Sequence, residues 1–259
     1  MNLGQTRLTV RERSISEVVD LAFRASLALG GGLYLRLGMF TVLPASALCV
    51  AAHSQGVAGW PLWLLTGACF TFIQGPFTIA ASRLMFSSSV SLRSVLAQFL
   101  SSIFRFTLAK LAGIALLVGG GMLVLVLPIV LARVLYLGEV TLVEGTGVSA
   151  SYRRCIRLSA KRIGSALATW SALAGIAVGF VVSAHVLIGA IGQDLLGFAP
   201  VSELWAEGPT PLSCLGLLVA APLVATARFL AYIDNRTRHE AWDVQVDFMR
   251  LAANLERTA

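Results

Sequence analysis

Charged residues are scarce in this chain of 259 residues, at 13% of the sequence, against about 25% in an average soluble domain. Hydrophobic residues make up 57%, and the mean hydropathy is +0.81. This composition excludes an ordinary soluble domain. In a soluble protein the net charge of +7 would suggest a nucleic-acid partner. Beside long apolar runs it indicates attraction to anionic lipid headgroups instead, so we expect membrane lipids as partners and no nucleic acid.

Residues and motifs for catalysis are also lacking. The three histidines, His53, His185 and His239, are far apart in the chain, and no GxSxG, HExxH or GxxxxGK[ST] motif occurs. No CxxC or Cys/His ligand spacing is present among the four cysteines. We therefore expect no enzymatic activity, no cofactor and no metal site.

A removable signal peptide is not expected, because residues 1–14 are polar and basic with no apolar core. Cys49 and Cys214 both fall near the predicted outer face. They are either a disulfide pair or isolated cysteines that serve as small hydrophobic residues.

Apolar stretches long enough to cross a membrane, about 20 helical residues, lie at 34–54, 60–82, 163–191 and 211–233. A further apolar segment, 106–143, is too long for one untilted span. Basic residues stand at both of its ends, which predicts that both ends are cytoplasmic and that the segment crosses twice. The turn is expected between the glycine run at 119–121 and Pro128, because Gly relaxes a helix and Pro suits a helix start.

The stretches that would connect the six spans on the far side, 55–59, 119–127 and 192–210, contain no Lys or Arg. Basic residues are retained on the cytoplasmic side, so both termini are predicted to be cytoplasmic.

A helical segment precedes each odd-numbered span and begins at Ser16, Ser91 and Ser149. We therefore predict an all-α integral membrane protein, a single domain over 1–259. It would consist of three units, each an amphipathic helix plus a helical hairpin, and a C-terminal amphipathic helix. The predicted ranges of the three units and of that helix are 15–85, 90–144, 148–233 and 234–259.

Polar groups at membrane depth are the candidate site. Gln74 adjoins Gly75 and Pro76 near the middle of the second span, and interrupted helices supply binding sites in transporters. Arg133 and Glu139 lie in the short fourth span, where an ionisable group is costly and Arg133 needs a partner from elsewhere. In contrast, Arg36, Lys110 and Arg228 are expected to extend to the cytoplasmic interface.

A stripe of small residues runs down one face of the fifth span and predicts a helix contact, either inside the monomer or between copies in a homo-oligomer. Its members are Gly164, Ala168, Ser171, Gly175, Gly179 and Ser183. A second group predicts a basic cytoplasmic surface before the same span, formed by Arg153, Arg154, Arg157, Lys161 and Arg162.

Three stretches resemble a group of bacterial six-span membrane proteins related to the membrane domain attached to some glycerophosphodiester phosphodiesterases. They are SEVVDLAFR from Ser16, Pro128 followed by VEGTGV and RRCIRLS at 143–159, and AYIDNRTRHEAWD at 231–243. The resemblance implies a six-span protein of the bacterial cytoplasmic (inner) membrane. It implies no reaction, because free-standing members have no established activity and this chain has no room for the phosphodiesterase barrel.

Two functions fit these features. The first is a non-enzymatic inner-membrane scaffold or accessory subunit that engages lipids or a protein partner through its basic cytoplasmic face. The second is a small transporter or channel with a polar path near Gln74 and Arg133. A transporter would bring Gln74, Arg133 and Glu139 together at a cavity, whereas a scaffold would have a tightly packed core.

Overall fold

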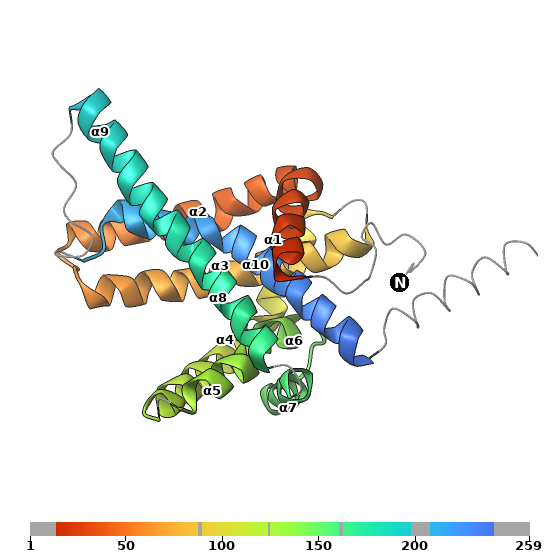
Figure 1. Cartoon of the computed structure of the whole chain (residues 1–259). Coiled ribbons are helices and arrows are strands. Elements are labelled where there is room, and N and C mark those ends of the chain that lie inside the picture. Colours follow the sequence, from red (N-terminus) through yellow and green to blue (C-terminus); the bar gives the residue numbers. More distant parts are fainter. Residues whose placement is uncertain (1–13, 88–89, 124, 161–162, 198–207, 241–259) are drawn as a thin grey trace, which may run out of the picture.

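The structure, a computed structural model, describes residues 14–87, 90–123, 125–160, 163–197 and 208–240 (Figure 1). All regular elements in these ranges are helices, which confirms the all-α prediction. In chain order they are α1 (Ile15–Arg24), the π-helical turn η2 (Ala25–Leu29), α2 (Gly31–Ser54), α3 (Trp60–Phe86), α4 (Leu92–Gly121), α5 (Leu127–Val134), α6 (Leu137–Val143), α7 (Val148–Ser159), α8 (Ile163–Ser183), the π-helical turn η3 (Ala184–Ile188), α9 (Gly189–Leu196) and α10 (Pro211–Glu240).

Local sequence explains where several helices begin. The Ser14 side chain accepts a hydrogen bond from the Glu17 backbone N–H, and the Glu17 carboxylate accepts one from the Ser14 N–H, so that a capping box starts α1. Ser91 caps α4 in the same way, through the backbone N–H of Ser94. Before α3, Gly59 adopts a positive φ of 65°, which only glycine takes up at little cost.

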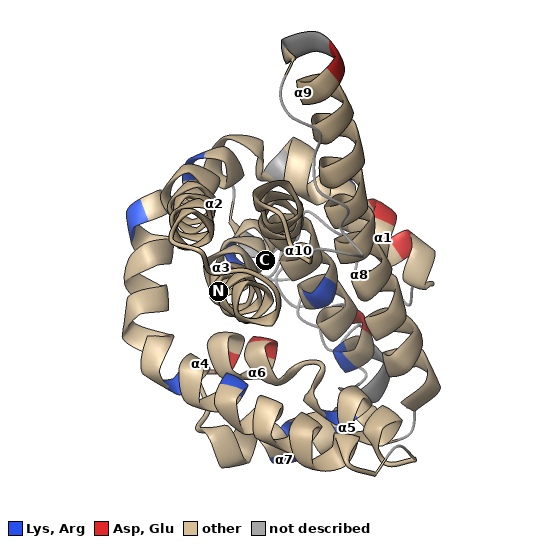
Figure 2. Cartoon of the chain, turned by 90° about the vertical axis from the view of Figure 1, so that its left-hand side faces the viewer, with Lys and Arg blue, Asp and Glu red and all other residues tan. Residues whose placement is uncertain are grey.

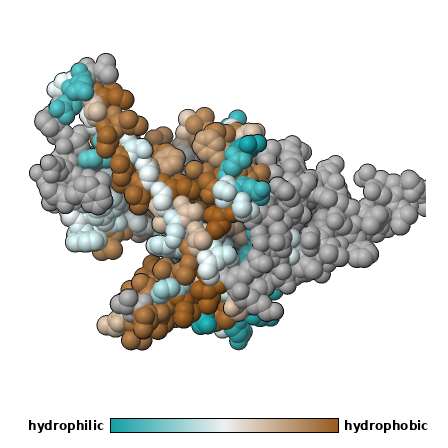
Figure 3. Space-filling model, viewed as in Figure 1, coloured by the Kyte–Doolittle hydropathy of each residue, from teal (hydrophilic) through white to brown (hydrophobic). Residues whose placement is uncertain are grey.

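Five helices are long and apolar enough to cross a membrane: α2, α3, α4, α10, and α8 extended through η3 and α9. Their ribbons carry few charged residues (Figure 2). Apolar side chains cover much of the outer surface along α8 and the α4–α5 hairpin (Figure 3). An apolar outer surface suits hydrocarbon as the solvent, and these features are those of a multi-pass membrane protein.

The long apolar segment forms a hairpin, as predicted. α4 ends at Gly121, and Pro128 lies in the first turn of α5. The returning arm is two short helices, α5 and α6, divided at Leu135 and Tyr136 rather than one continuous span. Neither piece alone is long enough to cross a bilayer.

α10 occupies the centre of the bundle, where it packs against α1, α2, α3 and α8 (Figure 2). The Tyr34 hydroxyl hydrogen-bonds the Thr226 hydroxyl at 2.8 Å and joins α2 to α10. The Tyr34 ring also lies edge-on to Phe77 of α3, with centroids 5.1 Å apart. α10 is therefore the element around which the other spans are arranged.

Two predicted amphipathic helices are not separate elements. The segment from Ser91 continues without a break into the span and forms the first part of α4. Residues 234–240 likewise continue α10, and the rest of the predicted C-terminal helix lies outside the described residues. Helix propagation without a Gly or Pro interruption explains both differences. By contrast, α7 is a separate helix, preceded by Gly145 with a φ of 66°.

Candidate functional site

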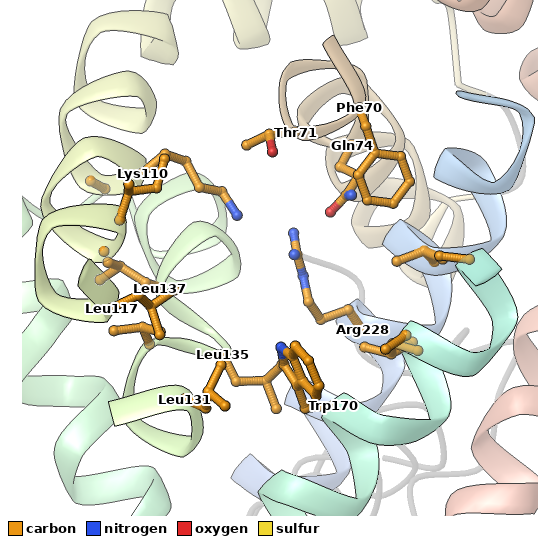
Figure 4. A pocket seen from close by; sticks show the side chains of 18 residues that line it. Phe70, Thr71, Gln74, Lys110, Leu117, Leu131, Leu135, Leu137, Trp170 and Arg228 are labelled. Carbon is orange, nitrogen blue, oxygen red and sulfur yellow. The ribbon is translucent and has the colours of Figure 1, made fainter. Parts of the chain in front are cut away.

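A cavity of about 370 Å³ lies inside the bundle, between α3, α4, α5, α6, α8 and α10 (Figure 4). Most of its wall is apolar, with a few polar side chains. The lining residues are Phe70, Thr71, Gln74, Ala109, Lys110, Gly113, Ile114, Leu117, Leu131, Val134, Leu135, Leu137, Trp170, Leu173, Ala174, Ala177, Val224 and Arg228. Ligand sites in proteins have this character, with volumes of about 300–1,000 Å³.

Three long polar side chains from three helices end in the cavity. Gln74 comes from α3, Lys110 from α4 and Arg228 from α10, and Figure 4 shows their polar ends pointing toward the same space. Gln74 is only 3% exposed, and its carbonyl oxygen Oε1 has no hydrogen-bond partner among the described residues. A buried acceptor without a donor costs about 1–3 kcal/mol, so this oxygen favours a ligand or water that can donate.

The charges at the cavity do not cancel. The Arg228 Nε donates to Oε1 of Glu139 on α6 at 2.5 Å, and these side chains are 12% and 0% exposed. Lys110 interacts electrostatically with both members of this pair. Among the described residues, two basic side chains at the cavity therefore share one carboxylate. At low dielectric this excess favours an anion.

Small and aromatic residues hold Lys110 in place. A Cβ added at Gly138 of α6 would lie 3.0 Å from the Lys110 Nζ, so glycine leaves the space that the ammonium group occupies. The same Nζ lies 5.4 Å from the centroid of the Phe106 ring, a cation–π distance. These contacts direct the lysine toward the cavity and away from the end of α4.

Gln74 is positioned by a close approach of α3 and α4. A Cβ added at Gly75 would lie 2.2 Å from Cε2 of Phe99, so the Phe99 ring packs directly on the α3 backbone. The Gln-Gly-Pro sequence thus combines a polar side chain facing the cavity with a glycine that admits the neighbouring helix.

The predicted polar site is brought together only in part. Gln74 lines the cavity, and Glu139 contacts it through Arg228. Arg133 is half-buried on α5 and is not among the lining residues. The prediction that Lys110 and Arg228 extend to the interface is wrong, because both side chains end in the cavity. The sequence feature that Lys110 and Arg228 share is that each is a single basic residue inside an otherwise apolar stretch of a long helix.

A second group of charges joins α6, α7 and α10 where these helices meet. The Glu144 carboxylate accepts from the Tyr232 hydroxyl at 2.6 Å and from Arg154 Nε at 3.3 Å, and Arg236 lies 3.9 Å away. This cluster fixes α7 against the bundle.

The predicted basic surface is therefore divided between structural and exposed positions. Arg154 is bound to Glu144, whereas Arg153 and Arg157 are exposed on the outer face of α7. Lys161 and Arg162 lie outside the described residues. The exposed positions on α7 leave two guanidinium groups for contacts beyond the chain.

All six small residues of the α8 stripe, Gly164 to Ser183, are exposed. A pale band follows α8 on the face seen in Figure 3. An added Cβ at Gly175 or Gly179 would meet no atom within 4 Å. The interpretation that the stripe packs inside the monomer is thus wrong, and contact between copies stays a prediction. Inside the bundle, the close approach to α8 is made by Gly216 of α10.

The four cysteines are free. Cys49 and Cys214 are nevertheless neighbours, because both contact the Thr66 hydroxyl, at 3.5 and 3.2 Å. They lie together in the core as unpaired thiols.

No protein-family model, curated protein or solved structure matches the chain. The family resemblance suggested by the sequence stays a prediction, and function has to be argued from the cavity.

Proposed function

We propose that the protein is a small membrane transporter that binds an anionic substrate in the cavity between α3, α4, α8 and α10. The observation that carries this proposal is the excess of basic groups in an otherwise apolar chamber, where Lys110 and Arg228 share the single carboxylate of Glu139. Ionisable groups at membrane depth are expensive and mark substrate or ion pathways. A tightly packed scaffold would have no need of a cavity there.

A six-crossing topology belongs to this proposal. Ser14 and Ile15 at the start of α1 line the same pocket as Asp234 and Asn235 near the end of α10, which supports a location of both ends of the described chain at one face. A chain whose two ends lie at the same face crosses the membrane an even number of times. With five long helices, the sixth crossing falls to α5 and α6, which would span about 25 Å if collinear at 1.5 Å per residue. The distribution of basic residues supports a cytoplasmic location for this face. The family resemblance supports the bacterial inner membrane as the membrane concerned.

Anion quenching of tryptophan fluorescence tests the site. Among the described residues, Trp170 is the tryptophan that lines the cavity. The other four tryptophans would be replaced by Phe, and the purified protein would be titrated with iodide and with neutral acrylamide. Lys110→Met should lower quenching by iodide relative to acrylamide, because it removes the positive charge that attracts the anion. Arg36→Met removes an exposed cation from α2 and should change nothing. An unchanged ratio of iodide quenching to acrylamide quenching in Lys110→Met would overturn the proposal.

The scaffold hypothesis stays a second proposal because Arg153 and Arg157 are exposed on α7. A charge-reversed variant, Arg153→Glu with Arg157→Glu, would be purified from its native membrane beside the unaltered protein. Loss of a co-purifying protein in the variant alone would support a docking role for α7. Purification of both forms without any partner would exclude it.

A further inference from the structure

The cavity is amphipathic along its length. Its polar end holds Gln74, Lys110 and Arg228. Beyond them, Ile114 and Leu117 of α4 and Leu131 of α5 form an apolar end. A small hydrophilic anion would leave this apolar wall without a matching partner. A ligand that is charged at one end and apolar at the other matches both ends.

The cavity also reaches surfaces that face the membrane. Ile114 lines the cavity and is 52% exposed, and Trp170 lines it and is 41% exposed. The hairpin beyond Ile114 is exposed and apolar, with Met122 at 86% and Leu125 at 92%. A ligand can thus enter sideways from the hydrocarbon, along walls that suit an acyl chain.

Charge and hydrogen bonding narrow the class of headgroup. The one excess basic group, Lys110, becomes a favourable cation beside a single negative charge, as in a phosphodiester. Lys and Arg are also the side chains that bind phosphate oxygens. The Gln74 carbonyl oxygen needs a donor, which a headgroup hydroxyl supplies. The ammonium group of a zwitterionic headgroup would be a third basic group close to Lys110 and Arg228.

Building on the proposed function, we infer that the substrate is a phospholipid with one net negative charge and a hydroxylated headgroup. The phosphodiester lies between Lys110 and Arg228, the headgroup hydroxyl donates to Gln74, and one acyl chain follows Ile114 and Leu117. The lipid enters from the bilayer without passing through water.

Native mass spectrometry of the full chain, released from detergent micelles, tests this inference. Phosphatidylglycerol, phosphatidylethanolamine and phosphatidylcholine with identical acyl chains would be added at equal concentration. Retention of phosphatidylglycerol over the zwitterionic lipids is expected, and Lys110→Met should reduce that retention about tenfold, as loss of one charge-assisted contact does. Arg36→Met should leave the retention unchanged. Equal retention of all three lipids, or equal retention by the Lys110 variant, would overturn the inference.

Gly138→Ala provides a second variant that keeps every charge. Its methyl group would lie 3.0 Å from the Lys110 Nζ and shift the ammonium group by a few tenths of an ångström, so it should weaken phosphatidylglycerol binding less than Lys110→Met does. Circular dichroism and gel filtration would establish that both variants fold.

Binding of a soluble anion distinguishes a failure of this inference from a failure of the proposed function. If inorganic phosphate or iodide reaches Trp170 in a manner that depends on Lys110, while phosphatidylglycerol shows no preference, the transporter proposal stands and the lipid inference fails. If neither the soluble anions nor the lipid depends on Lys110, both fail.

Discussion

Arg228 and Glu139 form a buried ion pair that connects α10 to α6, with 2.5 Å between Arg228 Nε and Glu139 Oε1. The pair stabilises the helix contact only while both partners are present, because each partner offsets the desolvation cost of the other. The second oxygen of Glu139, Oε2, has no hydrogen-bond partner among the described residues. The pair is therefore more readily explained as part of a binding site than as a contribution to stability.

Glu139→Ala is expected to destabilise the protein by ~3–5 kcal/mol, since it leaves Arg228 buried without its counter-ion. Thermal unfolding in detergent, followed by circular dichroism, would show a clear drop in the midpoint. Asp20→Asn serves as the control because it breaks a pair with Arg24 that is 61% and 74% exposed. Such a surface pair contributes little. Equal midpoints for the two variants would contradict the assignment of the Glu139 pair as buried.

Cys155 of α7 should resist alkylation in the folded protein. Burial raises the pKa of its thiol above the ordinary value, and the Glu139 and Glu144 carboxylates raise that pKa further. A raised pKa means that less thiolate is present at about pH 8, and the thiolate is the reactive form. A variant that keeps only Cys155 should react with maleimide at about pH 8 only after denaturation.

Ser149→Cys in a cysteine-free chain is the control for this experiment, because position 149 is exposed on the same helix and should react at once. Rapid native labelling of Cys155 would show that α7 does not cover it.

At the candidate site, sequence could identify Gln74 but not the two cations. Gln74 stands out because it is polar, next to Gly-Pro and in the middle of a span. Lys110 and Arg228 have long side chains that can reach the interface from a similar position, so their sequence positions do not reveal where they end. Only the contacts with Gly138 and Glu139, which come from a distant segment, decide their direction.

Among the elements, α8 and α10 meet closely because Gly216 has no side chain. A Cβ added there would lie 2.5 Å from the Phe180 carbonyl oxygen and 2.8 Å from the Ala184 Cβ. The Phe180 oxygen is a backbone atom, as is the Val181 Cα at 2.9 Å, and a helix backbone cannot shift locally. Small residues allow such contacts between membrane helices.

Gly216→Ala is therefore expected to separate α8 from α10 and to cost ~1–3 kcal/mol, as overpacking typically does. Gly175→Ala is the matched control, because it adds the same methyl group on the open face of α8. Thermal midpoints in detergent should fall for Gly216→Ala and stay level or rise for Gly175→Ala. A fall for Gly175→Ala would instead indicate that the α8 stripe is covered in the purified protein, as in a homo-oligomer.

The spans themselves followed closely from sequence. The predicted stretch 34–54 compares with α2 at Gly31–Ser54, and 211–233 falls within α10 at Pro211–Glu240. Long apolar runs identify spans because hydrocarbon leaves no alternative to a helix. The division between α5 and α6 could not be read in this way, since Leu135 and Tyr136 are apolar and the break depends on packing against α4, α7 and α8.

For the whole molecule, the side on which each connection lies decides how the cavity can work. The cavity lining on α4 runs from Ala109 to Leu117, in the half of the helix that leads to the hairpin tip at Met122. If α5 and α6 complete a crossing, the cavity lies within the membrane, between the face that carries α7 and the face that carries the hairpin tip.

Membrane-impermeant maleimide applied to intact cells should test the topology with single cysteines in a cysteine-free chain. Met122→Cys lies at the exposed tip between α4 and α5, and Ser149→Cys lies on α7 after the returning arm. We expect Met122→Cys to be labelled from outside and Ser149→Cys only after permeabilisation, because α5 and α6 bring the chain back across. Ser54→Cys, at the exposed end of α2, should behave like Met122→Cys. Labelling of positions 122 and 149 from the same side would show that α5 and α6 enter the membrane without crossing it, which leaves an odd number of crossings and the two ends of the chain on opposite faces.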